Sequence, residues 1–273
     1  MNGSPVRVGL LGCGNVGGAL AQLIASEGAS VAERTGVHLE IARVAVRDLS
    51  KARSAVLPDG VLTDDAEAVV SSPDVEVVVE TIGGVEPART LLLDALKAGK
   101  PVVSANKELM AAAGAEMFEA ASAAGVDLLF EAAVAGGIPL IRPLRESLAG
   151  ERLTRVMGIV NGTTNYILTR MAEDGASYED ALAEAQRLGY AEPDPTADVD
   201  GLDAAAKAAI IAGIAFGGKI VAGDVYTEGI RAITARDIAF ANQLGYVVKL
   251  LAIADQVDGR VAVRVHPAMV PKT

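Results

Sequence analysis

The stretch VRVGLLGCGNVGG, residues 6–18, decides the fold. Its first six residues are an apolar run typical of a strand, and a helical stretch follows the glycines. Gly12, Gly14 and Gly17 form a GxGxxG pattern, which in this strand–turn–helix context predicts a dinucleotide-binding turn. Glycines there allow a tight turn and close approach of the backbone to a pyrophosphate, and the helix N-terminus offers N–H groups to the phosphates. We therefore predict that the three glycines bind a dinucleotide cofactor.

Strand-like and helical stretches alternate through the rest of the first half of the chain. This alternation predicts right-handed crossovers and hence a parallel sheet. Ligands bind at the carboxyl ends of the strands in such sheets, so Lys107, just after a predicted strand, is expected to meet cofactor or substrate. A surface lysine at a helix start is the alternative. The predicted strands are 38–46, 75–80, 101–104 and 126–130, and the predicted helices are 19–32, 87–98 and 109–124.

The end of the second predicted strand bears on the choice between NAD and NADP. Arg47 and Asp48 follow that strand, with Lys51 and Arg53 close behind. A site for NAD usually presents an acid here to the ribose 2′-hydroxyl, whereas an arginine suits a 2′-phosphate. The three cations favour NADP and Asp48 leaves NAD open. A solvated loop with no role in binding is the third interpretation.

The pattern changes after Gly136. Two neighbouring strands joined by the short turn Asp258-Gly259 predict an antiparallel pair. We therefore predict an α/β chain in which a Rossmann-type, parallel-sheet nucleotide-binding domain, residues 1–136, is followed by an α+β substrate-binding and dimerisation domain, residues 137–273. Its predicted helices are 138–148, a helix capped by Thr163 or Thr164, 177–188 and 234–244, and its predicted strands are 152–160, 246–254 and 260–266.

The densest group of acids lies in GYAEPDPTADVDGLDAAAKAA, residues 189–209. Asp200 is predicted to cap a helix, with Asp203 in a capping-box spacing. From residue 204 to residue 218 the one polar side chain is Lys207, which indicates a buried helix. Burial lowers the pKa of a lysine and an acid four residues earlier raises it, so Lys207 is a candidate for proton exchange near neutral pH. A structural ion pair at the helix start is the alternative.

The composition excludes several classes of partner and site. The net charge is −11 and the pI is near 4.7, so nucleic acid and anionic membranes are not expected to bind. Every stretch of 18 residues contains a charge or a helix breaker, so no membrane span is expected. Cys13, the single cysteine, fits a reducing, cytoplasmic compartment and is interpreted as a packing residue between the glycines. His38 and His266 lie far apart in the sequence, so no His/Cys metal site is predicted.

Six segments together resemble the homoserine dehydrogenases, in the order that this family has them. The resemblance covers nearly the whole chain, and its long acidic segment is highly specific. It implies reduction of L-aspartate-4-semialdehyde to L-homoserine with NADH or NADPH, in the pathway to threonine and methionine. It also implies a homodimer or higher homo-oligomer, which the antiparallel strands near residue 260 could form across a two-fold axis. The segments are GLLGCGNVGG (9–18), SANKE (104–108), EAAVAGGIPL (131–140), VNGTTNYIL (160–168), GYAEPDPTADVDGLDAAAKAAI (189–210) and ITARDIAF (233–240).

The resemblance also implies roles for individual residues. Lys207 matches the family's proton donor, and Lys107 matches a second lysine near the nicotinamide and the substrate oxygen. The matched acids that hold the substrate amino group and line its pocket are Glu192, Asp198 and Asp203. Besides the glycines of the turn, the matched nucleotide-contacting residues are Asn15, Val16, Arg47, Lys107 and Gly189. A sodium ion bound largely by backbone oxygens is implied at Glu131, Val134, Gly136 and Ile138.

The end of the sequence differs from the family pattern. The chain stops at Thr273, where the family continues with a glycine-containing segment that returns to the nucleotide domain. We expect this difference to affect closure over the cofactor, and we expect no threonine feedback through a C-terminal ACT-type domain. Two other functions stay open: another NAD(P)-dependent amino-acid dehydrogenase, and a non-catalytic dinucleotide-binding sensor.

Overall fold

The computed structural model describes residues 4–53 and 55–272. The outer ends of the two predicted domains, residues 1–3 and Thr273, lie outside the described residues. The chain divides into two compact units, Met1–Ile138 and Pro139–Thr273. This division lies two residues beyond the boundary between residues 136 and 137 that the sequence pattern predicts.

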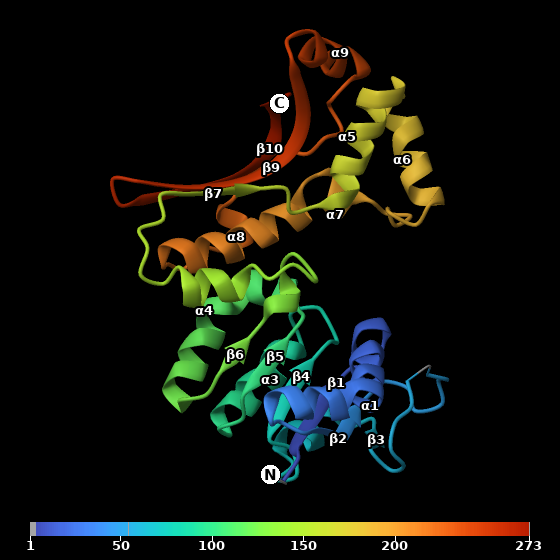
Figure 1. The fold of residues 1–273 in the computed structure, drawn as a ribbon, viewed down its shortest axis with the longest axis vertical. Coiled ribbons are helices and arrows are strands. Elements are labelled where there is room, and N and C mark those ends of the chain that lie inside the picture. Colours follow the sequence, from blue (N-terminus) through green and yellow to red (C-terminus); the bar gives the residue numbers. More distant parts are fainter. Residues whose placement is uncertain (1–3, 54, 273) are drawn as a thin grey trace. The chain divides into compact units, whose positions relative to one another are not determined.

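The first unit contains a six-stranded parallel sheet in the order β3-β2-β1-β4-β5-β6 (Figure 1). The order reverses direction at β1, and such a switch point is where a dinucleotide binds in doubly wound sheets. The predicted Rossmann-type sheet is confirmed. Its strands are β1 (Val6–Leu11), β2 (Leu39–Ala45), β3 (Leu62–Thr63), β4 (Val77–Glu80), β5 (Val102–Ser104) and β6 (Leu128–Leu129).

The helices of the first unit begin and end where local chemistry dictates. Asn106 caps α4 by accepting a hydrogen bond from the Leu109 N–H at 3.0 Å, and Gly125 ends that helix with a φ of 66°. Asp65 caps α2 in the same way, at 2.8 Å from the Ala68 nitrogen. The sequence pattern had not predicted α2 or β3, which are short. The helices are α1 (Asn15–Thr35), α2 (Ala66–Ser71), α3 (Ala88–Lys97), α4 (Lys107–Ala124) and the single turn η1 (Glu131–Ala133).

The second unit contains a four-stranded sheet in the order β7-β9-β10-β8. β9 and β10 form the predicted antiparallel hairpin, which is longer than expected (Figure 1). Its strands pair without a register shift, from Tyr246 opposite Pro271 to Val257 opposite Arg260. Asp258 and Gly259 turn the hairpin with φ values of 50° and 75°, as a two-residue Asp-Gly turn requires. The strands are β7 (Arg155–Gly158), β8 (Tyr226–Thr227), β9 (Tyr246–Val257) and β10 (Arg260–Pro271).

Helix α8 (Leu202–Phe216) packs against β9 and β10 and contributes to the hydrophobic core of the second unit. It buries a run of alanines against the sheet, including Ala205, Ala208 and Ala212. Small side chains let the helix lie close to the strands, which fits the apolar stretch that predicted a buried helix. The helices of this unit are η2 (Pro143–Ser147), α5 (Gly162–Asp174), α6 (Tyr178–Arg187), α7 (Thr196–Val199), α8 (Leu202–Phe216), η3 (Ala222–Asp224) and α9 (Ala235–Gln243).

Two predicted helix caps in the second unit are wrong. Asn161, not Thr163 or Thr164, caps α5 and accepts from the Thr164 N–H at 2.9 Å. Asp200 does not cap α8. It ends α7, while Gly201 precedes α8 with a φ of 81°. At α5, several residues with capping side chains lie side by side, and Asn161 is the one used. At α8 no side chain caps the helix, because Asp200 pairs with Arg231 instead. The predicted helix 138–148 is also reduced to a short stretch around η2.

Within the described part of the chain, no helix is long and apolar enough to cross a membrane. Among the same residues, no group of three or more His, Cys, Asp or Glu side chains is arranged to hold a metal ion.

Candidate active site

The glycine turn after β1 shows what each of its three glycines does. Gly12 has a φ of +94°, a conformation that favours glycine, and a Cβ there would lie 2.9 Å from Ile82 Cγ2. A Cβ on Gly17 would lie 2.2 Å from the Gly12 carbonyl oxygen. A Cβ on Gly14 would meet no atom of the described residues within 4 Å. Packing therefore explains Gly12 and Gly17, whereas Gly14 leaves open space where a side chain would otherwise stand.

The N-terminus of α1 is suited to an anion. The helix begins at Asn15 after Gly14, which has no side chain to cap it, and its first turn carries no acid. The first N–H groups of a helix lack intrahelical partners, and the helix dipole adds partial positive charge there. Val16, in this turn, is 57% exposed. The open space at Gly14 and these N–H groups together fit a pyrophosphate.

Cys13 lies within the turn and packs against the apolar cluster of the β1 and β2 strands. Partial burial raises the pKa of its thiol, with the Arg53 guanidinium acting weakly in the opposite direction. A thiol with a raised pKa is a poor nucleophile near neutral pH. This geometry supports the interpretation of Cys13 as a packing residue.

The charged side chains of the loop after β2 differ in the contacts that they make. Asp48 Oδ1 accepts hydrogen bonds from the Ser50 hydroxyl at 2.6 Å and from the Ser50 N–H at 2.9 Å, and these bonds lower the pKa of the Asp48 carboxyl. Arg53 donates to the Lys51 carbonyl at 2.7 Å and to the Asp48 carbonyl, so its guanidinium braces the loop. Arg47 is exposed, and no ion pair or hydrogen bond engages its side chain among the described residues. Arg47 is therefore available to a ligand, and so is the exposed Lys51, whose side chain also has no partner among the described residues.

A buried carboxylate organises the carboxyl ends of β4 and β5. Glu80 is 0% exposed, and its Oε1 accepts from the N–H groups of Ile82 at 2.8 Å and Gly83 at 3.0 Å. Its Oε2 accepts from the Ser104 hydroxyl at 2.7 Å. Glu80 thus ties the loop after β4 to the loop after β5. The sequence analysis missed this role, although an acid ending the apolar run VEVVVE was a signal for it.

Lys107 is the first residue of α4, directly after the Asn106 cap, and is partly buried. The Asn106 side chain also donates to the Gly84 carbonyl at 2.6 Å, so it joins the same pair of loops that Glu80 holds. Lys107 therefore starts its helix from a braced position at the carboxyl edge of the sheet, where sequence reasoning expected it.

The segment proposed for sodium is an irregular turn after β6. Glu131 begins η1, and its carbonyl accepts a long hydrogen bond, 3.3 Å, from the Val134 N–H. Ala135 and Gly136 follow with φ values of 62° and 57°. Positive φ at a non-glycine residue costs about 1–2 kcal/mol and is concentrated at ligand clamps and turns. Val134 is buried and Ile138 is 67% exposed.

In the second unit, Lys207 and Asp203 are the two charged residues of helix α8, which is otherwise apolar. The Lys207 ammonium donates to Asp203 Oδ2 at 2.6 Å, one helical turn earlier, and to the Val160 carbonyl at 2.8 Å. The side chains of Lys207 and Asp203 are 18% and 6% exposed. The third N–H of the ammonium has no acceptor among the described residues, which leaves it free to reach a ligand oxygen.

Asn161 links the predicted acids to one another. Its Nδ2 donates to Asp198 Oδ1 at 2.6 Å and to Asp203 Oδ2 at 2.9 Å. The structure thus brings Lys207, Asp203 and Asp198 into one hydrogen-bonded cluster. Sequence reasoning did not single out Asn161, because its partners lie 37 and 42 residues away.

No hydrogen bond joins the Glu192 side chain to that cluster among the described residues. Glu192 is exposed on the loop before α7, and its side chain has no hydrogen bond or ion pair within the described residues. Its backbone carbonyl accepts from Gln186 Nε2 at 3.1 Å, which fixes the loop but not the carboxylate. Gly189 lies just after α6, is exposed and has a φ of 79°. Gly189 belongs to the second unit, whereas the glycine turn belongs to the first.

The acidic loop is held in place from a distant part of the chain. Arg231 pairs with Asp200, which raises the pKa of the guanidinium, and its Nη2 lies 3.3 Å from the Thr196 hydroxyl. A Cβ on Gly229 would lie 2.2 Å from the Val199 carbonyl oxygen, so the loop passes too close for any side chain at that position. Helix α7, which carries Asp198, is therefore held by contacts from residues 229–231.

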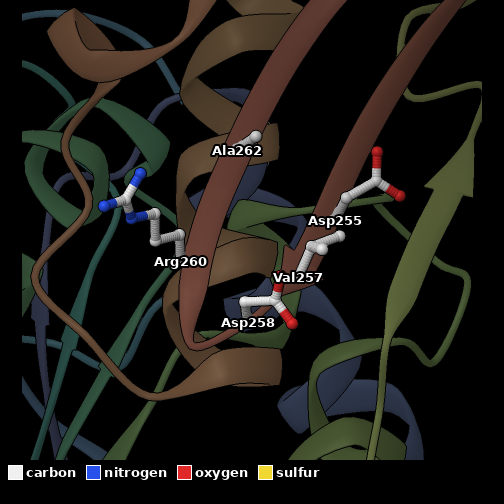
Figure 2. Close-up of a pocket in the computed structure, with 5 residues that line it drawn as sticks. All are labelled: Asp255, Val257, Asp258, Arg260 and Ala262. Atoms are coloured by element: carbon white, nitrogen blue, oxygen red, sulfur yellow. The ribbon is translucent and has the colours of Figure 1, made fainter.

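A hollow of about 540 Å³ lies at the tip of the β9–β10 hairpin (Figure 2). It is lined by side chains from both strands and the turn: Asp255, Val257, Asp258, Arg260 and Ala262. No residue of the predicted site belongs to this lining among the described residues. Asp255 is already engaged, because it accepts hydrogen bonds from Arg155 and, at 2.7 Å, from Arg264.

Family models match both units of the chain. Residues 12–131 match the model described as "Homoserine dehydrogenase, NAD binding domain", and residues 139–273 match the model described as "Homoserine dehydrogenase". The homoserine dehydrogenase of Corynebacterium glutamicum is 54% identical over 98% of this chain and 61% of the relative. That of Synechocystis is 50% identical over 98% of this chain and 62% of the relative. The chain thus spans about three fifths of the length of these curated relatives.

Solved structures agree with this match. The crystal structure of a homoserine dehydrogenase from Thiobacillus denitrificans superimposes with a TM-score of 0.92 and 48% identity, over 98% of this chain and 62% of that one. A hyperthermophilic archaeal homoserine dehydrogenase in complex with NADPH gives a TM-score of 0.81 at 29% identity, over 97% of this chain and 82% of that one. The two family models together cover most of the sequence, and the two relatives are 54% and 50% identical over 98% of it. The chain belongs to the homoserine dehydrogenase family.

Proposed function

We propose that this chain catalyses the NAD(P)H-dependent interconversion of L-aspartate-4-semialdehyde and L-homoserine. The observation that carries the proposal is the cluster of Lys207, Asp203 and Asp198 in a chain of this family. A partly buried ammonium with one unused N–H is suited to an oxygen that gains negative charge. The adjacent carboxylates suit a substrate that carries an ammonium group.

The chemistry divides between the cofactor and the side chains. When bound, the nicotinamide supplies the hydride that adds to the aldehyde carbon. The carbon–oxygen double bond then becomes a single bond, and the oxygen takes up the electron pair. Lys207 donates a proton to that oxygen and completes the alcohol, and in the reverse direction its neutral amine accepts the proton. General acid catalysis of this kind contributes about 10²–10⁴-fold to the rate.

The charge of the cluster favours an amino-acid substrate. Asp198, Asp203 and Lys207 together carry two negative charges and one positive charge, so the cluster keeps one net negative charge. A substrate ammonium is attracted to such a site, whereas a substrate with carboxylates alone is repelled. Glu192, exposed and unpaired within the described residues, supplies a further carboxylate for this ammonium. We propose Glu192, Asp198 and Asp203 as the substrate-binding acids.

The first unit is proposed to bind the dinucleotide through Gly12, Gly14, Asn15, Val16 and Gly17. The open space at Gly14 and the uncapped start of α1 support this assignment. Lys107 is proposed as a second functional lysine, at the carboxyl edge of the same sheet. Gly189 remains a proposed nucleotide contact that rests on the resemblance alone.

NADP is proposed as the preferred cofactor. Arg47 is exposed with no intramolecular partner among the described residues, whereas Asp48 is committed to Ser50 in its own loop. An available arginine and an engaged acid at this strand end favour a 2′-phosphate over a free ribose 2′-hydroxyl. The archaeal family member described above is a complex with NADPH.

A sodium ion is proposed at the turn formed by Glu131, Val134, Gly136 and Ile138. Two successive residues with positive φ, Ala135 and Gly136, redirect the backbone of this turn. The Glu131 carbonyl faces the inside of this turn, where it accepts a hydrogen bond from the Val134 N–H at 3.3 Å. Carbonyl oxygens are suitable ligands for a hard cation.

We also propose that the protein forms a homodimer or higher homo-oligomer through the second unit's sheet. Met157 on β7 and Tyr226 on β8 are 56% and 62% exposed, and both strands lie at the edges of the sheet. Exposed strand edges and apolar side chains on them favour pairing with a second copy.

The activity is tested by following absorbance at 340 nm with L-homoserine and with NADP or NAD in turn. We expect turnover with both cofactors and a higher kcat/KM with NADP. L-aspartate in place of L-homoserine distinguishes another amino-acid dehydrogenase. Binding of NADPH without turnover of either amino acid would instead indicate a sensor. Repeating the assay with sodium or potassium chloride tests the proposed ion.

The proposed ammonium-binding role of Glu192 predicts a separate outcome. Glu192→Ala should raise KM for L-homoserine by about tenfold, since a charge-assisted hydrogen bond contributes about 1.5 kcal/mol. Its kcat should change little, because the proton donor is untouched. Glu179→Ala, an exposed acid in the first turn of α6, is the matched control and should leave KM unchanged. An unaltered KM in Glu192→Ala contradicts the role.

A further inference from the structure

Asn161 uses every hydrogen-bonding position of its amide. Its Oδ1 accepts from the Thr164 N–H at 2.9 Å and from the Thr164 hydroxyl at 2.8 Å. Its Nδ2 donates to Asp198 at 2.6 Å and to Asp203 at 2.9 Å. The residue is 5% exposed, and a primary amide offers two acceptor and two donor positions. All four are engaged by protein groups.

These contacts fix the orientation of the amide. In the opposite orientation, the carbonyl oxygen would face two carboxylates and the NH₂ group would face the Thr164 N–H. Acceptor would meet acceptor and donor would meet donor, so only one of the two orientations satisfies the network. The side chain therefore has one defined role toward each neighbour.

One of the two acids that the amide joins, Asp203, also binds the ammonium. Asp203 Oδ2 receives both the Asn161 amide, at 2.9 Å, and the Lys207 ammonium, at 2.6 Å. Two carboxylates held this close would repel each other in a buried site unless donors lay between them. The Asn161 NH₂ group lies between Asp198 and Asp203 and offsets part of this repulsion. The position of Asp203, and through it the direction of the Lys207 ammonium, depends on that amide.

We propose that Asn161 is a positioning residue for the reaction: it sets the carboxylates of Asp198 and Asp203, and thereby aims the Lys207 ammonium at the reacting oxygen. The inference rests on the proposed function of Lys207. Helix capping alone does not require an asparagine, because serine and aspartate cap helices equally well. Serine lacks the NH₂ group that donates to both carboxylates, and aspartate has no donor for them.

This difference supplies the variants that separate the two roles. Asn161→Ser keeps a capping oxygen for α5 and removes both donors to the acids. Asn161→Asp keeps the shape and the cap but adds a third carboxylate to the cluster. Thr164→Val is the matched control, since it removes one hydrogen bond on the cap side of the amide and leaves both donors in place.

Chain 1–273 and each variant are assayed for kcat and for KM of L-homoserine and NADP, and their thermal unfolding is recorded. We expect kcat to fall at least about tenfold in Asn161→Ser and further in Asn161→Asp, because misplacement of about 1 Å costs up to about 10²-fold. KM for NADP should stay within about twofold in both, and Thr164→Val should keep wild-type kcat. A calorimetric titration with L-homoserine should show weaker binding to Asn161→Ser, independent of turnover.

Other results from the variants decide against the proposal. If Asn161→Ser or Asn161→Asp folds and keeps wild-type kcat, Asn161 does not position Lys207. If neither variant folds, or if kcat falls equally in Thr164→Val, the residue is structural only. The unaltered chain could bind L-homoserine and yet show no turnover. That result counts against the proposed function, but not against the role of Asn161 in positioning the acids. Loss of that binding in Asn161→Ser then still supports the arrangement of the acids.

Discussion

The glycine turn of the first unit and the Lys207 cluster of the second are built in opposite ways. The turn offers backbone N–H groups and empty space, with a Cβ excluded at Gly17 and no neighbour within 4 Å of the Gly14 Cβ position among the described residues. The cluster offers side chains that are nearly buried and joined by short hydrogen bonds. A phosphate needs donors that approach closely, whereas proton transfer needs a group of defined charge and direction. The comparison predicts that cofactor binding weakens when atoms are added to the turn. It also predicts that turnover falls when atoms are removed from the cluster.

The largest effect is expected from removing the ammonium. Lys207→Ala should lower kcat by about 10²–10⁴-fold, because the developing negative charge loses its proton donor. KM for NADP should remain unchanged. Lys249→Ala is the matched control, since Lys249 is a partly buried lysine of the same unit that bonds to the Thr169 hydroxyl at 2.8 Å. Wild-type kcat in Lys207→Ala at saturating substrate would falsify the proton-donor role.

Adding one carbon to the turn is the complementary test. Gly14→Ala should fold normally, yet raise KM for NADP and NAD by about tenfold or more, equivalent to about 1.4 kcal/mol, because its methyl group enters the space proposed for the pyrophosphate. Gly28→Ala is the control: it lies inside α1 with no described atom within 4 Å of its Cβ position. That change should stabilise the protein by about 0.5–1 kcal/mol and leave KM unaltered. Equal KM values for Gly14→Ala and the parent chain contradict the assignment.

Asp255, another buried acid of the second unit, tests whether every charged network in that unit contributes to catalysis. Asp255 is 8% exposed and accepts from Arg155 and Arg264, which lowers the pKa of its carboxyl. Asp255→Asn should lower the free energy of unfolding by about 1–3 kcal/mol at neutral pH, with kcat unaltered. Asp258→Asn, exposed in the hairpin turn and compatible with its positive φ, is the control.

The pH dependence of this loss has a defined sign. A carboxyl whose pKa is lowered by folding stabilises the protein above the unfolded pKa, about 3.9, and loses that contribution as pH falls through the folded value. The difference in unfolding free energy between the parent chain and Asp255→Asn should therefore be largest above about pH 4 and shrink below it. Urea unfolding at several pH values measures it. A difference that grows on acidification contradicts the ion-pair account.

The smallest effect is expected at Arg47. Arg47→Ala should weaken NADPH more than NADH, by a few-fold to about tenfold, since an exposed charge-assisted contact contributes about 1 kcal/mol. Arg34→Ala, an exposed arginine in the last turn of α1, controls for loss of surface charge. KM values for both cofactors give the ratio. Equal weakening of the two cofactors argues against recognition of the 2′-phosphate.

Much of the first unit could be predicted because its signals are local. β1 runs over the predicted residues 6–11, and the glycine turn and α1 follow directly in the chain. Lys107 was predicted at the carboxyl edge because strand β5 ends three residues earlier. The bracing of that edge by Glu80 was not predicted, since its contact with Ser104 spans 24 residues.

In the second unit, the sequence determined the pair Asp203 and Lys207, because residues four apart on a helix share a face. It also determined the hairpin turn at Asp258-Gly259. The caps of α5 and α8 were predicted wrongly: Asn161 caps α5 in place of its threonine neighbours, and Asp200 pairs with the distant Arg231 instead of capping α8. Tertiary structure alone decided that Asn161 joins Asp198 to Asp203. It also decided that the backbone at Val199 packs directly against Gly229, where a side chain would not fit. Such contacts depend on where distant segments pack, and no local periodicity records that packing.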